Sequence, residues 1–157
     1  MTSEWPDLAG RIDGQTHRLP VRVYYEDTDF SGIVYHANYL RFAERGRSDF
    51  LRLAGVHHAS LFDGAEPLAF AVYRMEIDFL RPARIDDRLE VRTRYVRASG
   101  ARIEAEQTIL RFLEGAEPEP IWRARVVAAC LDGGGRPRRL PAQVQQALAP
   151  FVAADDN

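Results

Sequence analysis

The first regular pattern of apolar and polar residues is an alternation that begins at Leu19. Every second position then carries an apolar or aromatic side chain: Val21, Val23 and Tyr25. This period of two predicts a half-buried β-strand that ends near Asp27, because the turn-forming residues 28–32 follow it. Residues 1–19 are polar and rich in turn formers, so we expect them to form a flexible arm.

In the next segment, apolar residues recur at intervals of three and four positions, which predicts a long helix. The residues that share its apolar side are Tyr39, Phe42, Ala43, Gly46, Phe50, Leu53 and Ala54. Arginine and glutamate side chains mostly occupy the opposite side, as in a helix that covers a core with one face. Gly55 is a natural end for this helix, because glycine readily adopts the left-handed conformation found after many helices.

Strands dominate the rest of the chain, and the segments that alternate are residues 68–80, 88–98, 102–113 and 121–131. In the first segment the alternation changes phase near Arg74 and Met75, which predicts a β-bulge or a strand break. The short Ser99-Gly100 turn predicts that the second and third segments form a hairpin. Residues 141–151 have the spacing of a short closing helix.

This order of elements predicts an α+β fold. Consecutive strands with short links form antiparallel sheets, and one long helix can cover the apolar face of such a sheet. We therefore expect one long helix wrapped by a five- to six-stranded antiparallel sheet. We expect a single domain over residues 20–152, with the arm before it and a loose tail over residues 153–157.

Composition removes several classes of protein. The chain has 157 residues and a net charge of −2, which argues against a generic nucleic-acid or anionic-membrane binder. There is no lysine, so all 21 basic residues are arginine. The single cysteine, Cys130, lies in an apolar run and predicts a buried structural thiol rather than a disulfide framework. No apolar run reaches about 18 residues and no signal peptide is visible, so we expect a cytoplasmic protein without a membrane segment.

The densest cluster of reactive side chains lies just before the long helix. Asp27 and Asp29 precede the turn at Gly32, and the first amides of a helix have no acceptor within the helix. Such a helix start can stabilise negative charge on a carbonyl oxygen, while a nearby carboxylate acts as nucleophile or general base. The alternative is that both aspartates only cap the turn.

Two further groups are candidates for other roles. Glu44 is a second candidate for the reactive carboxylate, but with Asp29 in that role we interpret Glu44 as pairing with an arginine or lining the pocket. His57 and His58 lie in a loop without a third ligand at a suitable spacing, so we expect no metal site.

The residues around this cluster carry a recognisable motif. It consists of the runs Arg22-Val-Tyr-Tyr-Glu-Asp-Thr-Asp29, Gly32-Ile-Val-Tyr-His-Ala-Asn-Tyr39 and Phe42-Ala-Glu-Arg-Gly-Arg47. The motif resembles the signature of the hotdog-fold acyl-CoA thioesterases of the 4-hydroxybenzoyl-CoA thioesterase type, and most closely their Tol–Pal-associated (YbgC-type) branch. Together with the later order of strands, the resemblance covers roughly residues 21–131. Relatives commonly carry a small residue or proline where this chain has Phe30.

The resemblance implies a hotdog fold and hydrolysis of an acyl-CoA to a free acid and CoA, without a cofactor. Asp29 matches the catalytic carboxylate, and the backbone amide of His36 matches the group that polarises the thioester carbonyl. The implied substrate contacts are Tyr25, Gly32, Ile33, Val34 and Tyr35, with Arg97 and Ser99 for the CoA moiety. The side chain of His36 either contacts substrate or Asp29, or only packs at the helix start.

The resemblance also implies an assembly larger than one chain, because an exposed sheet edge is normally covered by a second subunit. We expect a homodimer or homotetramer with active sites at the subunit interface, and acyl carrier protein is a possible partner. Two alternative functions remain open: a hotdog enoyl-thioester hydratase or dehydratase, and a non-catalytic module that binds acyl carrier protein or envelope machinery.

Overall fold

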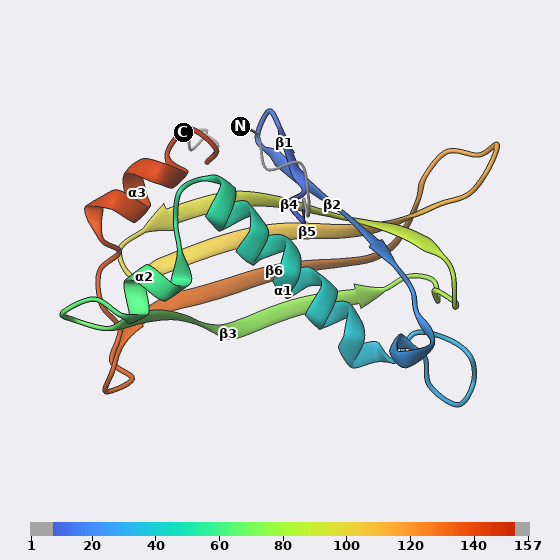
Figure 1. Cartoon of the computed structure of the whole chain (residues 1–157), viewed down its shortest axis with the longest axis horizontal. Helices are drawn as coiled ribbons and strands as arrows, with labels where there is room; N and C mark the ends of the chain where they lie inside the picture. Colours follow the sequence, from blue (N-terminus) through green and yellow to red (C-terminus); the bar gives the residue numbers. More distant parts are fainter. Residues whose placement is uncertain (1–7, 153–157) are drawn as a thin grey trace, which may run out of the picture.

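A six-stranded antiparallel sheet, in the order β1-β2-β4-β5-β6-β3, curves around the long helix α1 (Figure 1). The computed structural model describes residues 8–152. The strands are β1 (Arg11–Asp13), β2 (Thr16–Arg22), β3 (Leu68–Phe79), β4 (Arg88–Ser99), β5 (Arg102–Phe112) and β6 (Glu119–Asp132). The helices are α1 (His36–Leu53), α2 (His58–Phe62) and α3 (Ala142–Leu148), with a 3₁₀ helix at Tyr25–Asp27. The predicted α+β layout is confirmed.

The N-terminal part of the chain differs from the prediction of an arm over residues 1–19. Residues 11–19 belong instead to the hairpin of β1 and β2, in which Asp13 pairs with Thr16 and Gly14 has a φ of +63°. An Asp-Gly step between two extended segments favours such a tight hairpin, so the signal was present in the sequence. Residues 1–7 of the predicted arm, and the predicted tail over 153–157, lie outside the described residues.

The strand predicted to end near Asp27 ends earlier, at Arg22. The next residues turn into the 3₁₀ helix, where the carboxylate of Asp27 accepts a hydrogen bond from the Tyr24 amide at 2.8 Å. The Thr28 hydroxyl donates to the Tyr25 carbonyl oxygen at 2.9 Å. Short polar side chains can form hydrogen bonds with backbone groups in this way. These bonds replace the backbone hydrogen bonds to a neighbouring strand that a longer β2 would have made.

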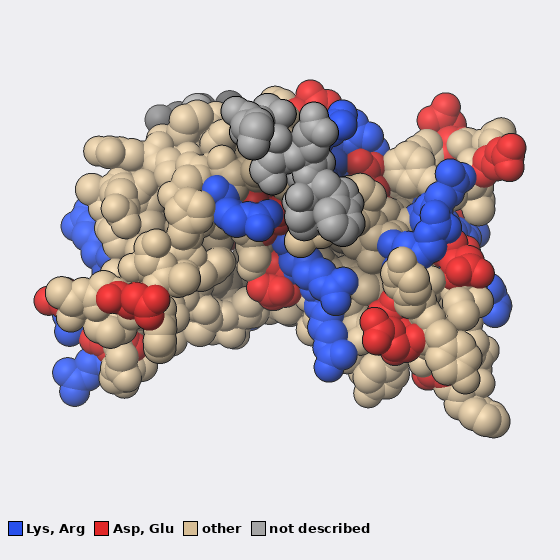
Figure 2. Space-filling model, in the orientation of Figure 1, with Lys and Arg blue, Asp and Glu red and all other residues tan. Residues whose placement is uncertain are grey.

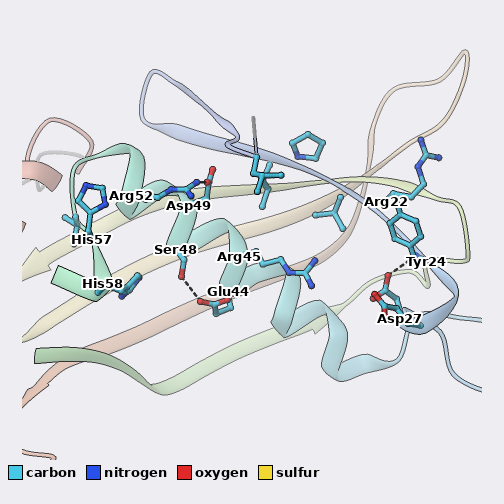
Figure 3. A pocket seen from close by; sticks show the side chains of 17 residues that line it. Arg22, Tyr24, Asp27, Glu44, Arg45, Ser48, Asp49, Arg52, His57 and His58 are labelled. Carbon is cyan, nitrogen blue, oxygen red and sulfur yellow. Dashed lines mark hydrogen bonds and ion pairs between the residues drawn. The ribbon is translucent and has the colours of Figure 1, made fainter. Parts of the chain in front are cut away.

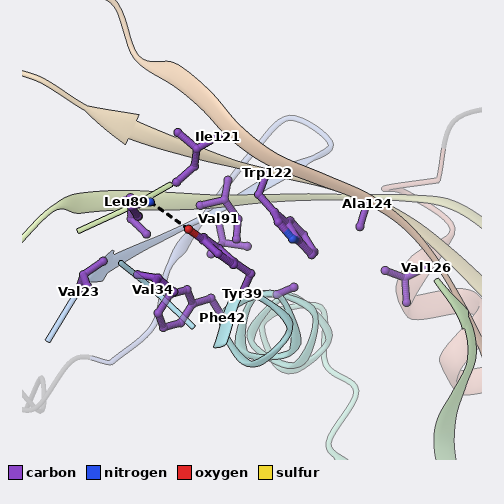
Figure 4. Packing of buried hydrophobic residues seen from close by; sticks show 13 residues of the cluster. Val23, Val34, Tyr39, Phe42, Leu89, Val91, Ile121, Trp122, Ala124 and Val126 are labelled. Atoms are coloured by element: carbon purple, nitrogen blue, oxygen red, sulfur yellow. Dashed lines mark hydrogen bonds between the residues drawn. The ribbon is translucent and has the colours of Figure 1, made fainter. Parts of the chain in front are cut away.

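The apolar side of α1 packs into the concave face of the sheet, as its spacing predicts, except that Leu53 at the end of the helix is exposed (Figure 4). The Tyr39 ring stacks on Trp122 with centroids 6.3 Å apart, and its hydroxyl accepts a hydrogen bond from the Ala83 amide at 3.0 Å. Phe42 and Val91 are almost completely buried in the same cluster. These contacts fix the start of α1 against the chain segment that follows β3.

The middle of α1 lies close to the sheet at Gly46. A Cβ atom at this position would lie 2.8 Å from Val91 and 3.0 Å from the Thr93 hydroxyl. Beside it, the buried Gln107 amide donates to the Ala43 carbonyl oxygen at 2.8 Å and to the Thr93 hydroxyl at 2.9 Å. Glycine therefore permits a helix–sheet contact that any side chain would push apart.

The remaining strand predictions are confirmed. The pairing of β3 with β6 shifts register between Val72 and Arg74, which is the predicted bulge, and β4 and β5 form the predicted hairpin around Gly100. Within the described residues, β3 is an edge strand with a neighbour on one side only. Apolar side chains at or just beyond this edge are substantially exposed: Val72, Tyr73, Phe79 and Leu80.

Arginine and acidic side chains are interspersed on the surface rather than separated by sign (Figure 2). Many of them pair across the outer face of the sheet, as Arg123 does with Asp78 at 2.9 Å and Arg125 with Glu104 at 3.7 Å. Cys130 is completely buried, as predicted, and burial raises the pKa of its thiol. None of the helices in residues 8–152 has the length and apolar character needed to cross a bilayer.

Candidate active site

The loop between the 3₁₀ helix and α1 folds back on itself around Asp29. The Asp29 amide donates to the Ile33 carbonyl oxygen at 2.8 Å, and the Gly32 amide donates to the Asp29 carbonyl oxygen at 3.0 Å. Gly32 has a φ of +81°, a conformation that glycine adopts without strain. This tight turn holds the Asp29 side chain a few residues before the helix.

The carboxylate of Asp29 is kept in its charged form by the same loop. One of its oxygens accepts hydrogen bonds from the Ser31 hydroxyl at 2.5 Å and from the Ser31 amide at 2.8 Å. The Ser31 hydroxyl, followed by the Ser31 and Ile33 amides and the nearby His36, lowers the pKa of Asp29 below its ordinary value of 3.8. Asp29 therefore does cap its turn, and it is also an exposed, ionised carboxylate that can react.

The start of α1 is fixed by Asp27. Its carbonyl oxygen accepts hydrogen bonds from the Tyr35 amide at 2.9 Å and from the Asn38 side chain at 2.8 Å. His36 is the first residue of the helix, and within residues 8–152 its amide donates no hydrogen bond. An amide in this position points outward at the positive end of the helix dipole and can bind a carbonyl oxygen.

Asp29 and His36 line the same open cleft, which has a volume of about 420 Å³. Predicted contact residues Ile33 and Val34 also line it. The sequence analysis did not anticipate the opposite wall, which comes from the end of β3 and the residues after it: Phe79, Leu80, Arg81 and Pro82. No local sequence pattern predicts that these residues belong to the site. They are brought there by a long-range contact, the hydrogen bond from the Val34 amide to the Ala83 carbonyl oxygen, which joins residues about 50 positions apart.

Other predicted contact residues lie at the margin of this cleft or outside it. Gly32 shapes the turn, and the half-exposed Tyr35 ring lies 4.5 Å from the His36 ring between centroids. Tyr25 is largely exposed on the 3₁₀ helix and does not line the cleft. Phe30 is fully exposed at the tip of the turn, so it does not narrow the cleft within one chain.

Arg97 and Ser99, predicted to contact CoA, are not brought to the Asp29 cleft within one chain. They lie near the end of β4, where the Arg97 guanidinium donates to the Ser99 hydroxyl at 2.9 Å. The other end of β4, Arg88, pairs with Arg22 just before the loop that carries Asp29. At about 3.3 Å per residue, Arg97 lies roughly 30 Å along the strand from that end.

A larger cleft, about 840 Å³, lies elsewhere, between β2 and the exposed side of α1 (Figure 3). Glu44 lines this cleft and accepts a hydrogen bond from the Ser48 hydroxyl at 2.5 Å, and it forms no ion pair with any other residue in the range 8–152. His57 and His58 lie at the end of this cleft. Across residues 8–152, His, Cys, Asp and Glu side chains form no group of three or more that could hold a metal ion.

Comparisons with known proteins identify the family of this chain and its fold. A family model described as the thioesterase-like superfamily matches residues 23–148. The acyl-CoA thioester hydrolase YbgC of Escherichia coli O157:H7 is 40% identical over 128 residues, which cover 81% of this chain and 91% of that protein. A probable thioesterase from Bartonella henselae is 48% identical with a TM-score of 0.73, covering 80% of this chain and 99% of that one. The 4-hydroxybenzoyl CoA thioesterase from Pseudomonas sp. strain CBS-3 has a TM-score of 0.75 at 18% identity, covering 84% and 98%.

The chain therefore belongs to the thioesterase-like superfamily, and its sheet wrapped around α1 is the predicted hotdog fold. Within that class it is similar to the YbgC acyl-CoA thioester hydrolases over most of its length. The resemblance read from the residues around Asp29 and His36 is thus confirmed at the level of family and fold.

Proposed function

We propose that this protein hydrolyses an acyl-CoA thioester to a free carboxylic acid and CoA. The observation that carries the proposal is that the ionised carboxylate of Asp29 and the start of α1 at His36 line one cleft. The similarity to YbgC acyl-CoA thioester hydrolases supports the substrate class. A thioester has a good leaving group, so one carboxylate and one polarising helix start suffice without a metal.

The chemistry assigned to these groups is acyl transfer to water. The amide of His36 donates a hydrogen bond to the thioester oxygen and stabilises the negative charge that develops on it. Asp29 either attacks the carbonyl carbon, expelling the CoA thiolate and leaving an anhydride that water then cleaves, or removes a proton from the attacking water. Both routes return Asp29 to the carboxylate, and both require it to be ionised at the start.

In this proposal the side chain of His36, unlike its backbone amide, takes no direct part in the reaction. Its ring packs against Tyr35 and, 6.5 Å away between centroids, against Phe79 on the opposite wall of the cleft. It shapes the site and adds positive charge near Asp29 when protonated. The backbone amide is the group assigned to the reaction.

We further propose that the active unit is a homodimer or a homotetramer built on the free edge of β3. Two copies of an edge strand can pair antiparallel about a two-fold axis, which places the start of one strand beside the end of the other. The exposed Val72 and Phe79 side chains at this edge favour such pairing. It would carry Arg97 and Ser99 of one chain toward the Asp29 cleft of the other, where they bind the CoA moiety.

The decisive experiment replaces Asp29 with asparagine and measures release of free thiol from a panel of acyl-CoAs. We expect kcat to fall by about 10²- to 10⁴-fold, the usual contribution of a positioned acid or base. Asp27→Asn is the matched control, since this neighbouring carboxylate caps the 3₁₀ helix and should leave kcat within a few-fold of wild type. A folded Asp29→Asn protein with near-wild-type turnover would reject the assignment.

Following the absorbance of an enoyl-CoA beside thiol release separates the alternative functions. An enoyl-thioester hydratase would bleach the conjugated absorbance of an enoyl-CoA without releasing thiol, and a pure binding module would turn over no thioester. Acyl carrier protein as the natural carrier, a link to the Tol–Pal system and a cytoplasmic location remain predictions. Comparing acyl-CoA with acyl carrier protein thioesters, and fractionating cells, would check them.

A further inference from the structure

Residues 80–87 connect β3 to β4 and form neither a helix nor a strand. The first three of them line the Asp29 cleft, on the side opposite Asp29 and His36. On the side of α1, the connection is fixed at Ala83, whose amide donates to the Tyr39 hydroxyl at 3.0 Å. A connection without regular backbone pairing opens easily, so its other contacts also matter for the shape of the cleft.

The side chain of Arg111 holds the same connection from the side of the sheet. Arg111 lies on β5, and its guanidinium donates to the Pro82 carbonyl oxygen at 3.1 Å. The guanidinium also lies 3.5 Å from the Asp87 carboxylate, at the end of the connection. A third contact, at 2.5 Å, is its hydrogen bond to Glu119, which pairs with Arg111 across β5 and β6. One side chain thus joins the middle and the end of the connection to the sheet.

Asp87 and Glu119 extend the contacts of Arg111 to other parts of the wall. The Asp87 carboxylate accepts a hydrogen bond from the Arg84 amide at 2.8 Å, within the connection. Glu119 also lies 3.9 Å from the guanidinium of Arg81, which lines the cleft. Because both carboxylates contact the Arg111 guanidinium, loss of its charge would leave two like charges close together. The planar guanidinium reaches several partners at once, which an ammonium group does not do in the same geometry.

We propose, on the basis of the thioesterase function above, that Arg111 is a positioning residue for the reaction. It does not line the Asp29 cleft, and its side chain is only 18% exposed, so it acts through Pro82 and not on the substrate. By holding Pro82 it keeps this wall at the distance from Asp29 and the His36 amide at which the thioester is aligned. A misplacement of about 1 Å in such an alignment costs about 100-fold in rate.

Replacing Arg111 with glutamine tests this role through kcat and KM. We expect kcat to fall by about 10- to 100-fold while KM changes less than about threefold, because the thioester binds but is aligned less well. Arg18→Gln is the matched control: it removes the donor to the buried Glu90 carboxylate on β4, which should cost similar stability, and it should leave kcat near the wild-type value. Thermal unfolding shows whether both variants fold. Wild-type kcat in a folded Arg111→Gln protein, or an equal loss of kcat in both variants, would overturn the proposal.

Arg111→Lys separates the position of the wall from the balance of charge around it. A lysine keeps the positive charge between Asp87 and Glu119, but it lacks the fork that also reaches the Pro82 carbonyl oxygen. We expect most of the thermal stability to return while kcat stays at least about fivefold below wild type. If kcat returned together with stability, Arg111 would serve the fold alone and the proposal would be wrong.

An acyl-pantetheine thioester, which lacks the phosphates of CoA, tests whether Arg111 binds substrate instead. A positioning residue affects kcat to the same extent on acyl-CoA and on this thioester, since both place the same carbonyl group beside Asp29. A loss confined to acyl-CoA would make Arg111 a phosphate ligand and overturn the proposal.

Amide hydrogen exchange gives a readout that does not depend on activity. Peptides that span residues 80–87 should exchange at least about threefold faster in Arg111→Gln than in wild type or in Arg18→Gln. Unchanged exchange together with unchanged kcat rejects the positioning role and leaves the thioesterase function standing. Wild-type protein that hydrolyses no thioester rejects the thioesterase function, and with it the role of Arg111 in the reaction, even if exchange shows that Arg111 holds the connection.

Discussion

Ser31 donates two hydrogen bonds to one oxygen of Asp29, from its hydroxyl at 2.5 Å and from its amide at 2.8 Å. The hydroxyl is the main cause of the lowered pKa of Asp29. A serine two residues from the reactive carboxylate therefore sets the pH range in which the proposed reaction can run. Without it, Asp29 would hold its proton to higher pH.

The first prediction follows from this lowering of the Asp29 pKa by Ser31. Ser31→Ala should raise the pKa of Asp29 and move the acidic limb of the kcat/KM profile to higher pH, because only the ionised carboxylate reacts. Near pH 8 the variant should retain most of its activity. Thr28→Ala is the control, since the Thr28 hydroxyl donates to the Tyr25 carbonyl oxygen instead. If kcat/KM of wild type and Ser31→Ala fell at the same acidic pH, ionisation of Asp29 would not control the activity at low pH.

The second prediction concerns a buried His17, which lies 2.6 Å from the Asp49 carboxylate and ties the β1–β2 hairpin to α1. Burial holds the pKa of His17 below 6.5, although the hydrogen bond to Asp49 opposes this. As the pH falls below 6.5, the unfolded chain takes up a proton that the folded chain resists, so the free energy of unfolding should decrease. Urea unfolding between pH 7.5 and 5 measures this slope.

His17→Gln should flatten that dependence. It should also lower the free energy of unfolding at pH 7.5 by about 1–3 kcal/mol, because glutamine does not reproduce the stacking of the buried imidazole ring on Phe50. His57→Gln is the matched control at an exposed position. An unchanged slope in His17→Gln would place the pH dependence on other groups.

The third prediction tests the close contact at Gly46. Alanine is the better helix former by about 1 kcal/mol, yet Gly46→Ala should destabilise the protein, because its Cβ atom would lie 2.8 Å from Val91. Overpacking of this kind costs about 1–3 kcal/mol, which lowers the melting temperature by several degrees. Gly133→Ala, where a Cβ meets nothing within 4 Å, should be nearly neutral. A stabilised Gly46→Ala protein would mean that α1 can move away from the sheet at little cost.

The fourth prediction concerns Arg97 at the far end of β4. If this residue binds CoA phosphate across the dimer, Arg97→Gln should raise KM for acyl-CoA several-fold but leave the acyl-pantetheine thioester, which lacks phosphate, unchanged. Arg94→Gln, an exposed arginine on the same strand, should affect neither substrate. An equal change on both thioesters would point to a structural effect instead.

The sequence predicted the elements whose signals are local. The spacing from Tyr39 to Ala54 identified α1 because one helix face meets the core, and the phase change at Arg74 identified the bulge. The segment before Arg22 was misread, because its polar composition concealed an Asp-Gly hairpin. For the candidate site, the motif provided Asp29 and His36 on one side of the cleft.

The rest of the site depends on contacts between distant parts of the chain. The wall from Phe79 to Pro82 is placed by the contacts that Val34 and Tyr39 make to Ala83, which lies more than 40 positions further along the chain. Periodicity gives the face on which a side chain lies, but not which distant residue it meets. That information required the register of the whole sheet.

The bulge in β3 has a consequence for how this strand can change in evolution. Tyr73 is the extra residue between the pairs Val72–Ala128 and Arg74–Val127, so it shifts the inward-facing positions from even numbers before it to odd numbers after it. Loss of one residue elsewhere in the strand would turn part of its apolar side chains to solvent and open either the core or the Asp29 cleft. Substitutions along β3 should therefore be tolerated far more often than insertions or deletions, and the length of the strand is the property most tightly constrained.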